Sequence, residues 1–232
     1  YSQADFMRDS VQRRADGTES AGTGYSLSTA SYSCDVYALH KDIGDQTRAN
    51  SDNPLNPDMD ATRFLSQQML IRQEVQWAAD SFTTGVWGTD ATPSPLWDAA
   101  SSTPIADVET AKNTVLTNTG YVPNTIIMSY KAFSALVDNA DISAAEGATA
   151  SYAQVGDKDV LVCYTPPAPG LMVPSAGYTM NWSGVSAGLG TASAISRYRM
   201  DTLRADRIEI ESAFDFKIVS SALGYFLSNV TS

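Results

Sequence analysis

The sequence predicts an α+β fold, and three stretches support that prediction. Residues 58–82 repeat apolar side chains at helical spacing for longer than any other part of the chain. Residues 208–218 alternate apolar and charged side chains with a period of two, which is typical of a half-buried strand. Residues 104–137 place a short apolar strand between two amphipathic helices. A helix-strand-helix lobe together with a strand that needs a helical cover makes the chain α+β.

We interpret residues 58–82 as one long spine helix. Asn56-Pro57-Asp58 supplies its start, where Asp58 or Asp60 can accept hydrogen bonds from first-turn amides, and Gly85 supplies its end. At about 1.5 Å per residue the helix would be about 40 Å long, so something extended must lie along it. Its apolar stripe comprises Ala61, Phe64, Ile71, Val75, Ala78 and Phe82, widened by Leu65, Met69 and Ala79.

Residues 4–37 are predicted to form a long hairpin whose glycine-rich tip is flexible. Its two strands, 6–14 and 25–37, carry few large apolar side chains, and a lone hairpin of this kind is not stable in water. We therefore expect it to rest on a partner such as another chain. Residues 38–56 are largely polar, and we expect them to form a loop that leads to the spine helix.

Residues 104–188 are predicted to form a second lobe of α+β type. Proline suits the first position of a helix, glycine suits the position after its end, and serine is a favourable cap. The predicted elements are a helix from Pro104 to Gly120, a strand at 125–128, a helix capped by Ser129 and a strand at 159–164.

The apolar residues of the segment 208–218 share one parity and the charged residues occupy the other. Its one-sided apolar face needs a cover, and the spine helix is the only long amphipathic element that can supply one. The C-terminus therefore returns to the spine helix, and the second lobe is an insertion. The predicted division is 1–37 (N-terminal arm and extended loop), 38–103 (with the spine helix), 104–188 (inserted lobe) and 189–232 (C-terminal strands).

The composition argues against several classes of function. The formal net charge is −11, and no cluster of Lys and Arg could neutralise the phosphates of a nucleic acid. No apolar run approaches the roughly 20 residues that span a membrane. Cys34 and Cys163 lie far apart without metal-ligand spacing, so we expect reduced thiols rather than a disulfide scaffold or a zinc site.

One motif suggests an enzyme. Residues 184–188 read Gly-Val-Ser-Ala-Gly, which matches the G-x-S-x-G turn that holds the nucleophile of serine hydrolases. That fold needs a histidine after the serine, whereas the single histidine, His40, precedes Ser186. We prefer a Gly/Ser loop here and a surface or interface position for His40, and we keep a serine hydrolase using Ser186 as an alternative.

Other binding motifs are weaker still. Asp58 and Asp60 are too few oxygen donors for a hard cation, and helix capping explains both. Gly188-Leu189-Gly190 lacks the third glycine of a dinucleotide turn, and the phosphate-binding pattern G-x-x-x-x-G-K-[ST] does not occur. We therefore predict no enzyme activity, no catalytic, cofactor-binding or metal-binding residue, and no cofactor.

Four stretches, in this order, resemble one family. They are Leu55 to Glu74; Trp97 with Thr103-Pro104-Ile105 and Asp107-Val108; Gly120 to Ser129; and Ile208 to Gly224, which contains Phe-Asp-Phe-Lys and Ala-Leu-Gly. Together with the order of hairpin, spine helix, inserted lobe and returning strand, they resemble the major capsid proteins of tailed phages (Caudoviricetes). The resemblance implies the Hong Kong 97-like fold, with an extended loop near 4–37, a peripheral domain near 38–103 and 189–232, and an axial domain near 104–188.

The resemblance also implies a function. Such a protein assembles as hexamers and pentamers into an icosahedral head that encloses double-stranded DNA without binding a specific sequence. It would belong to the virion, be assembled in the host cytoplasm without a membrane, and meet scaffold, portal and decoration proteins. An encapsulin-like nanocompartment shell is the alternative within the same fold.

Two details bear on maturation. The sequence begins at Tyr1 without an initiator Met, which fits removal of an N-terminal extension. Some members of the family cross-link a loop lysine to an asparagine, but residues 4–37 contain no lysine. We therefore predict no cross-link of this kind.

Overall fold

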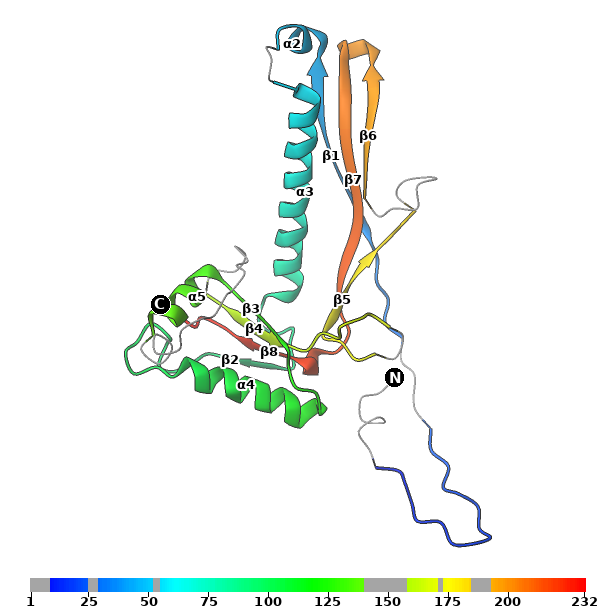
Figure 1. Ribbon diagram of the computed structural model, residues 1–232, viewed down its shortest axis with the longest axis vertical. Helices are drawn as coiled ribbons and strands as arrows, with labels where there is room; N and C mark the ends of the chain where they lie inside the picture. The colour runs from blue at the N-terminus through cyan, green and yellow to red at the C-terminus, as the bar shows by residue number, and fades with distance from the viewer. Residues whose placement is uncertain (1–8, 25–28, 52–54, 140–157, 171–172, 185–192) are drawn as a thin grey trace. The chain divides into compact units, whose positions relative to one another are not determined.

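The computed structural model describes residues 9–24, 29–51, 55–139, 158–170, 173–184 and 193–232. It contains both helices and sheets, so the predicted α+β class is confirmed (Figure 1). The chain forms two compact units. The spine unit comprises Tyr32–Ser81 and Tyr178–Lys217, and the lobe unit comprises Tyr1–Ser31, Phe82–Gly177 and Ile218–Ser232.

The spine unit contains one long helix and a four-stranded sheet. The sheet has the order β1-β7-β5, and β6 also pairs with β7. Both β1 and β6 run antiparallel to β7, which therefore lies inside the sheet. The elements are β1 (Asp35–Gly44), α2 (Asp45–Ala49), α3 (Pro57–Ser81), β5 (Gly177–Asn181), β6 (Ser193–Met200), the 3₁₀ turn η1 (Asp201–Leu203) and β7 (Ala205–Ile218).

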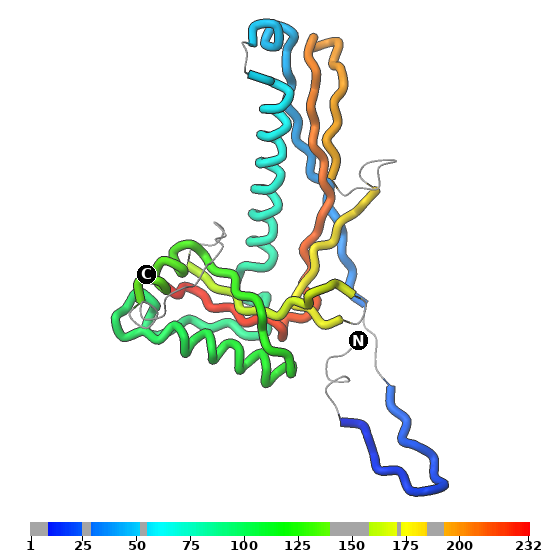
Figure 2. Tube along the Cα trace, viewed as in Figure 1, coloured from blue at the N-terminus to red at the C-terminus, as the bar shows by residue number. Residues whose placement is uncertain are grey.

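The predicted return of the C-terminal strand to the spine helix is confirmed. Within the spine unit α3 runs alongside β1 (Figure 2), and its side chains share one core with those of β7. On β7 the even-numbered apolar side chains enter this core, as period-two patterning requires. The core comprises Ile43, Ala61, Leu65, Met69, Ile208, Ile210 and Phe214.

The start of α3 differs in detail from the prediction. The Met59 amide donates to the side-chain oxygen of Asn56 at 3.2 Å, so Asn56 caps the first turn. Asp58 and Asp60 lie inside the first turn, so the cap predicted at one of them is wrong, and Asp58 instead accepts a hydrogen bond from Arg48 at 2.8 Å. The helix ends at Ser81, and Gly85 takes a left-handed φ of 80° in the turn that follows.

The predicted apolar stripe of α3 is buried only in part. The face that packs on the sheet is the row Ala61, Leu65 and Met69, in steps of four residues. Phe64 and Val75 of the predicted stripe lie outside the core and are exposed. The predicted stripe spans two apolar rows that lie side by side, and the sheet covers the row that combines small Ala61 with Leu65.

The loop expected at residues 38–56 is also wrong for most of its length. Residues 38–44 continue β1, and 45–49 form the short helix α2. On β1 the odd-numbered Tyr37, Leu39 and Ile43 share the face of Ile210 and its even-numbered neighbours. Lys41 lies in the same row and interrupts the apolar alternation that would have indicated a strand.

The arm that precedes β1 is extended and has no regular secondary structure where it is described. A turn at the predicted tip is closed by Thr18, whose amide and hydroxyl donate to the Ala15 carbonyl at 3.3 and 2.8 Å. The strands predicted at 6–14 and 25–37 are not formed in the described residues before Asp35. All of residues 11–24 are exposed, so nothing buries a side chain that could hold two strands together.

The lobe unit is built on a four-stranded sheet of order β2-β8-β4-β3. β2 pairs with β8 in parallel, and the other two pairs are antiparallel. The elements are β2 (Thr89–Ala91), α4 (Pro104–Thr119), β3 (Thr125–Met128), α5 (Tyr130–Asp138), β4 (Val160–Cys163), the 3₁₀ turn η2 (Ser221–Leu223) and β8 (Gly224–Leu227).

The helix signals predicted in this lobe are confirmed. Pro104 occupies the first turn of α4, and Gly120 caps its end with a left-handed φ of 73°. The Ser129 hydroxyl accepts from the Ala132 amide at 3.2 Å and so caps α5. The limits of the lobe differ from the predicted 104–188, because β2 and β8 both join its sheet. The lobe unit therefore takes in Phe82 onward and the C-terminal residues from Ile218.

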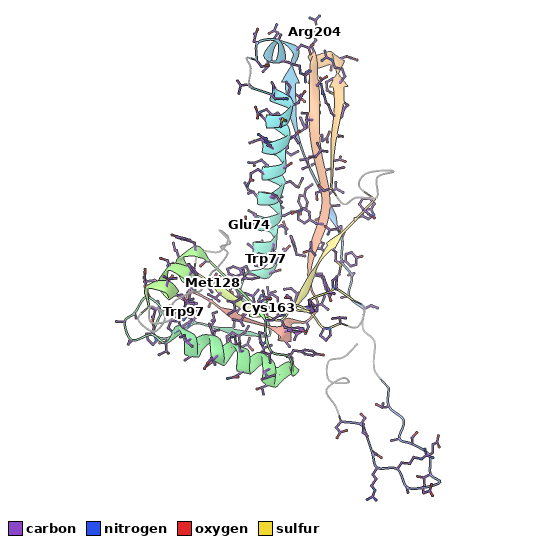
Figure 3. All side chains as sticks on the ribbon, viewed as in Figure 1. Glu74, Trp77, Trp97, Met128, Cys163 and Arg204 are labelled. Carbon is purple, nitrogen blue, oxygen red and sulfur yellow. The ribbon has the colours of Figure 1, made fainter. Side chains whose placement is uncertain are left out.

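A tryptophan ties α4 to the core of the lobe unit. Trp97 is 1% exposed and lies beside the first turn of α4 (Figure 3). Its indole N–H donates to the Asp107 carboxylate at 2.8 Å. A second contact holds the same residue, because the Asn139 side-chain amide donates to the Trp97 carbonyl at 3.2 Å. This geometry gives a physical reason for the spacing between Trp97 and Asp107.

We expect Asp107→Ala to destabilise the lobe unit by about 1–3 kcal/mol, because the buried indole N–H would lose its acceptor. Asp107→Asn should stay close to the wild type, since its amide oxygen still accepts a hydrogen bond. Thermal melting followed by circular dichroism measures both. Glu109→Ala on an exposed position of α4 is the control. Equal melting of Asp107→Ala and the wild type would show that the hydrogen bond contributes no stability.

Candidate assembly surface

A cluster of charged side chains holds the end of the spine unit where β1 leads into α2. Asp206 of β7 is at its centre and accepts hydrogen bonds from Arg48 at 2.5 Å and Arg197 at 2.6 Å. Arg199 reaches the other oxygen of Asp206 at 3.4 Å. We call these four residues the arginine clamp. It joins α2, β6 and β7.

Two further carboxylates extend the arginine clamp. Asp58 in the first turn of α3 pairs with Arg48 at 2.8 Å and with Arg197 at 3.4 Å. Asp45 of α2 binds both terminal nitrogens of Arg199, each at 2.6 Å. Bidentate pairing of this type fixes the geometry of both partners. The beginning of the spine helix is therefore tied to α2, β6 and β7 at once.

The hydrogen bonds of the arginine clamp hold the pKa of Asp206 well below its usual range, with Arg197 the largest cause and Arg48 the next. The bonds from Arg199 likewise lower the pKa of Asp45. A carboxylate with a depressed folded-state pKa stabilises the fold above its unfolded pKa, and that contribution is lost as the pH falls toward the folded value.

We therefore expect the melting temperature to fall as the pH is lowered below about 4, the ordinary pKa of an aspartate. Asp206→Asn should melt at a lower temperature than the wild type at pH 7 and should depend less on pH between 7 and 3. Differential scanning calorimetry across this range measures both effects. Asp201→Asn, which changes the most exposed carboxylate near the clamp, is the control. An unchanged pH dependence in Asp206→Asn would contradict this assignment.

The surface of the spine unit also has a groove beside α3. The groove has a volume of about 490 Å³, and its lining combines apolar Met59, Ile195 and Ile208 with polar and charged side chains. Met59 and Ile195 are exposed, so this part of the helix and of β6 is not fully covered by the chain's own core. This side of the spine unit therefore exposes apolar side chains next to charged ones.

The residues that the sequence singled out for chemistry do not form a catalytic site in the described part of the chain. His40 lies on β1 with Glu209 of β7 opposite it, and it is exposed. Ser186, with the rest of 185–188, lies outside the described residues. No group of three His, Cys, Asp or Glu within the described ranges could hold a metal ion.

The two cysteines are free in the structure. Cys163 is buried in β4, and burial raises the pKa of its thiol to about 11, which keeps it protonated and unreactive at neutral pH. None of the helices in the described ranges has the length and hydropathy needed to cross a bilayer.

Comparison with solved structures relates these features to known proteins. A phage-related protein from Bordetella bronchiseptica RB50 superposes with a TM-score of 0.69 at 20% identity, over 98% of this chain and 83% of that one. The capsid of cyanophage P-SCSP1u gives a TM-score of 0.60 at 11% identity, over 95% and 80% of the two chains. This chain has the fold of tailed-phage major capsid proteins. The resemblance seen in the sequence is thereby confirmed for the fold.

The capsid fold is shared with another kind of shell. The SrpI encapsulin from Synechococcus elongatus PCC 7942 gives a TM-score of 0.62 at 13% identity, over 87% of this chain and 76% of that one. No protein-family model matches the sequence, and no curated protein matches it either. The likeness therefore lies in the fold, and capsid and encapsulin structures are among those that show it.

The arginine clamp was not predicted from the sequence. Arg48 and Asp206 are 158 positions apart, and no local pattern connects them. The one available signal was the group of two arginines and one aspartate at 197–201, next to the strongest strand pattern. The capsid fold brings this group to the beginning of α3.

Proposed function

We propose that the protein is the major capsid protein of a tailed bacteriophage, which self-assembles as hexamers and pentamers into an icosahedral head around double-stranded DNA. The observation that carries the proposal is the likeness to a phage capsid structure over 95% of the chain, which includes both compact units. The exposed apolar side chains of the spine unit are compatible with contacts to other subunits. The net charge of −11 suits a wall that must not trap the packaged duplex.

The domain roles follow from this proposal. We assign the spine unit to the peripheral domain and the sheet of the lobe unit to the axial domain. The exposed segment 9–24 would be part of the extended loop. Scaffold, portal and decoration proteins would be partners of the assembled head, in the virion and during its assembly in the host cytoplasm. In this role the protein has no enzymatic activity of its own.

Electron microscopy of the purified protein tests the proposal. Closed shells tens of nanometres across are expected, whereas small discrete oligomers would contradict it. Labelling with a fluorophosphonate tests the serine hydrolase alternative, and covalent labelling of Ser186 would overturn the structural role. No label is expected, since no histidine follows Ser186 in the sequence.

The second candidate is an encapsulin-like shell, which the superposition on SrpI supports. A phage head and an encapsulin differ in what they enclose. Particles from a host that carries the complete phage would contain double-stranded DNA protected from nuclease, and particles of an encapsulin would contain a cargo protein. Nuclease-protected DNA favours the head, and a stoichiometric co-purifying protein without DNA favours the nanocompartment.

A further inference from the structure

The outer surface of α3 has a second apolar row beside the one that packs on the sheet. Phe64, Ile71 and Val75 are 51%, 42% and 51% exposed. With Gln68 they follow steps of four, three and four residues, which is the spacing of a coiled-coil seam. The row is about 16 Å long at about 1.5 Å per residue. Single exposed apolar side chains are ordinary, but a row with this spacing gives a second helix a surface on which it can pack.

The row lies wholly within the spine unit and is distinct from its core. The helix contributes Ala61, Leu65 and Met69 to the core and leaves the second row to one side of them. Lys41 of β1 lies over the Phe64 ring at 5.6 Å, so one edge of the row is bordered by a cation. The row itself is uncharged, and its apolar side chains are half exposed.

Two opposite charges flank the row on its other edge. Arg63 and Glu74 are eleven residues apart, which is about three helical turns, so they lie on one side of α3 near the two ends of the row. Glu74 lies on the side of the helix turned away from the strands (Figure 3). Neither residue has an ion-pair partner among those that the structure describes. The two charges are therefore available to a partner.

This arrangement is complementary to itself. In an antiparallel pair related by a two-fold axis, the same edge of each helix meets, and every contact occurs twice. A register that places Phe64 against the partner's Val75 also places Gln68 against the partner's Ile71. Arg63 then lies within about 3 Å, along the helix axis, of the partner's Glu74. The apolar row and the two charges therefore fit the same register of the two helices.

We propose that α3 helices from two copies of this protein pack antiparallel through Phe64, Gln68, Ile71 and Val75, with two Arg63–Glu74 ion pairs across the two-fold axis. The proposal rests on the proposed shell function and specifies one contact between its subunits. The second copy is the occupant because the row and its charges complement themselves in one register. An extended segment such as 9–24 of a neighbour is the competing occupant, and the test distinguishes the two.

The test is a charge exchange in the full chain. Arg63→Glu and Glu74→Arg each place like charges together twice, and we expect each to lower the yield of assembled particles about fivefold or more. The double variant Arg63→Glu/Glu74→Arg restores opposite charges and should recover the yield to within about twofold of the wild type. Sedimentation and negative-stain microscopy measure the yield. Lys112→Glu and Glu109→Arg on α4 are controls of matched charge change and should assemble normally.

The outcomes separate this contact from the shell function itself. If the wild type forms shells, two results would overturn the helix pairing and leave the shell function standing. One is that the single variants assemble normally, and the other is that the double variant assembles no better than the single variants. The latter result is expected if a neighbouring arm covers the row. If the wild type forms no shells, the proposed function fails, and sedimentation equilibrium of the free protein then tests the pairing. A dimer lost in both single variants and regained in the double variant would support it, and a monomeric wild type would overturn it.

Discussion

Replacing Phe214 with Asp is expected to abolish soluble folding of the protein. Phe214 is 2% exposed, and its ring stacks on Tyr37 with the centroids 4.8 Å apart. A carboxylate at this place would lie between sheet and helix without a cationic partner. Burying such a charge costs several kcal/mol, comparable to the about 5–15 kcal/mol that stabilises a whole domain. Ile210→Asp, at a position 4% exposed in the same core, should fail in the same way.

The measurement is the soluble fraction after expression, followed by thermal melting of whatever is soluble. Phe214→Leu keeps an apolar side chain and is expected to fold with a reduced melting temperature. Leu203→Asp is the matched control, since Leu203 is exposed in η1 and its replacement buries no charge. A soluble Phe214→Asp variant that melts like the wild type would refute the packing of β7 on α3.

Elements that are indicated by residues close together in the sequence were predictable. The helical repeat from Pro57 to Ser81, the proline at the start of α4 and the serine that caps α5 each depend on residues a few positions apart. The alternation along β7 is equally local, and its one-sided face required a cover. The fold class and the return of the C-terminus to the spine helix followed from these signals.

Features that depend on distant partners were not predictable. β8 is four residues long, and its pairing with both β2 and β4 is what places the C-terminal residues in the lobe unit. On α3, two adjacent apolar rows were both candidates for the core, and the choice between them depends on which row the sheet accommodates. The arginine clamp joins residues that no local period connects. In each case the deciding contact is tertiary.

The exposed arm before β1 is the basis of the second prediction with a large expected effect. Residues 11–24 are all exposed, and Val11, the one large apolar side chain among them, is 90% exposed. The turn closed by Thr18 and Ala15 is too small to hold the arm together. Residues 11–24 bury nothing within the described chain and so contribute little to folding, and we infer that their contacts lie on a neighbouring subunit.

We therefore expect that replacing residues 15–24 with Asp-Gly, a tight turn that can close a hairpin, leaves the folded units intact and sharply lowers the yield of shells. The circular dichroism spectrum and melting temperature should stay nearly unchanged, because neither the spine core nor the lobe core includes these residues. A deficit of about 1 kcal/mol per contact changes one equilibrium only several-fold, but it is repeated at every subunit boundary of a closed shell. Sedimentation should show free subunits or small oligomers in place of shells.

Replacing residues 15–24 with a Gly/Ser segment of equal length is the control, since it separates the effect of length from the effect of side-chain chemistry. Intact shells at normal yield from the shortened chain would show that the arm is dispensable for assembly.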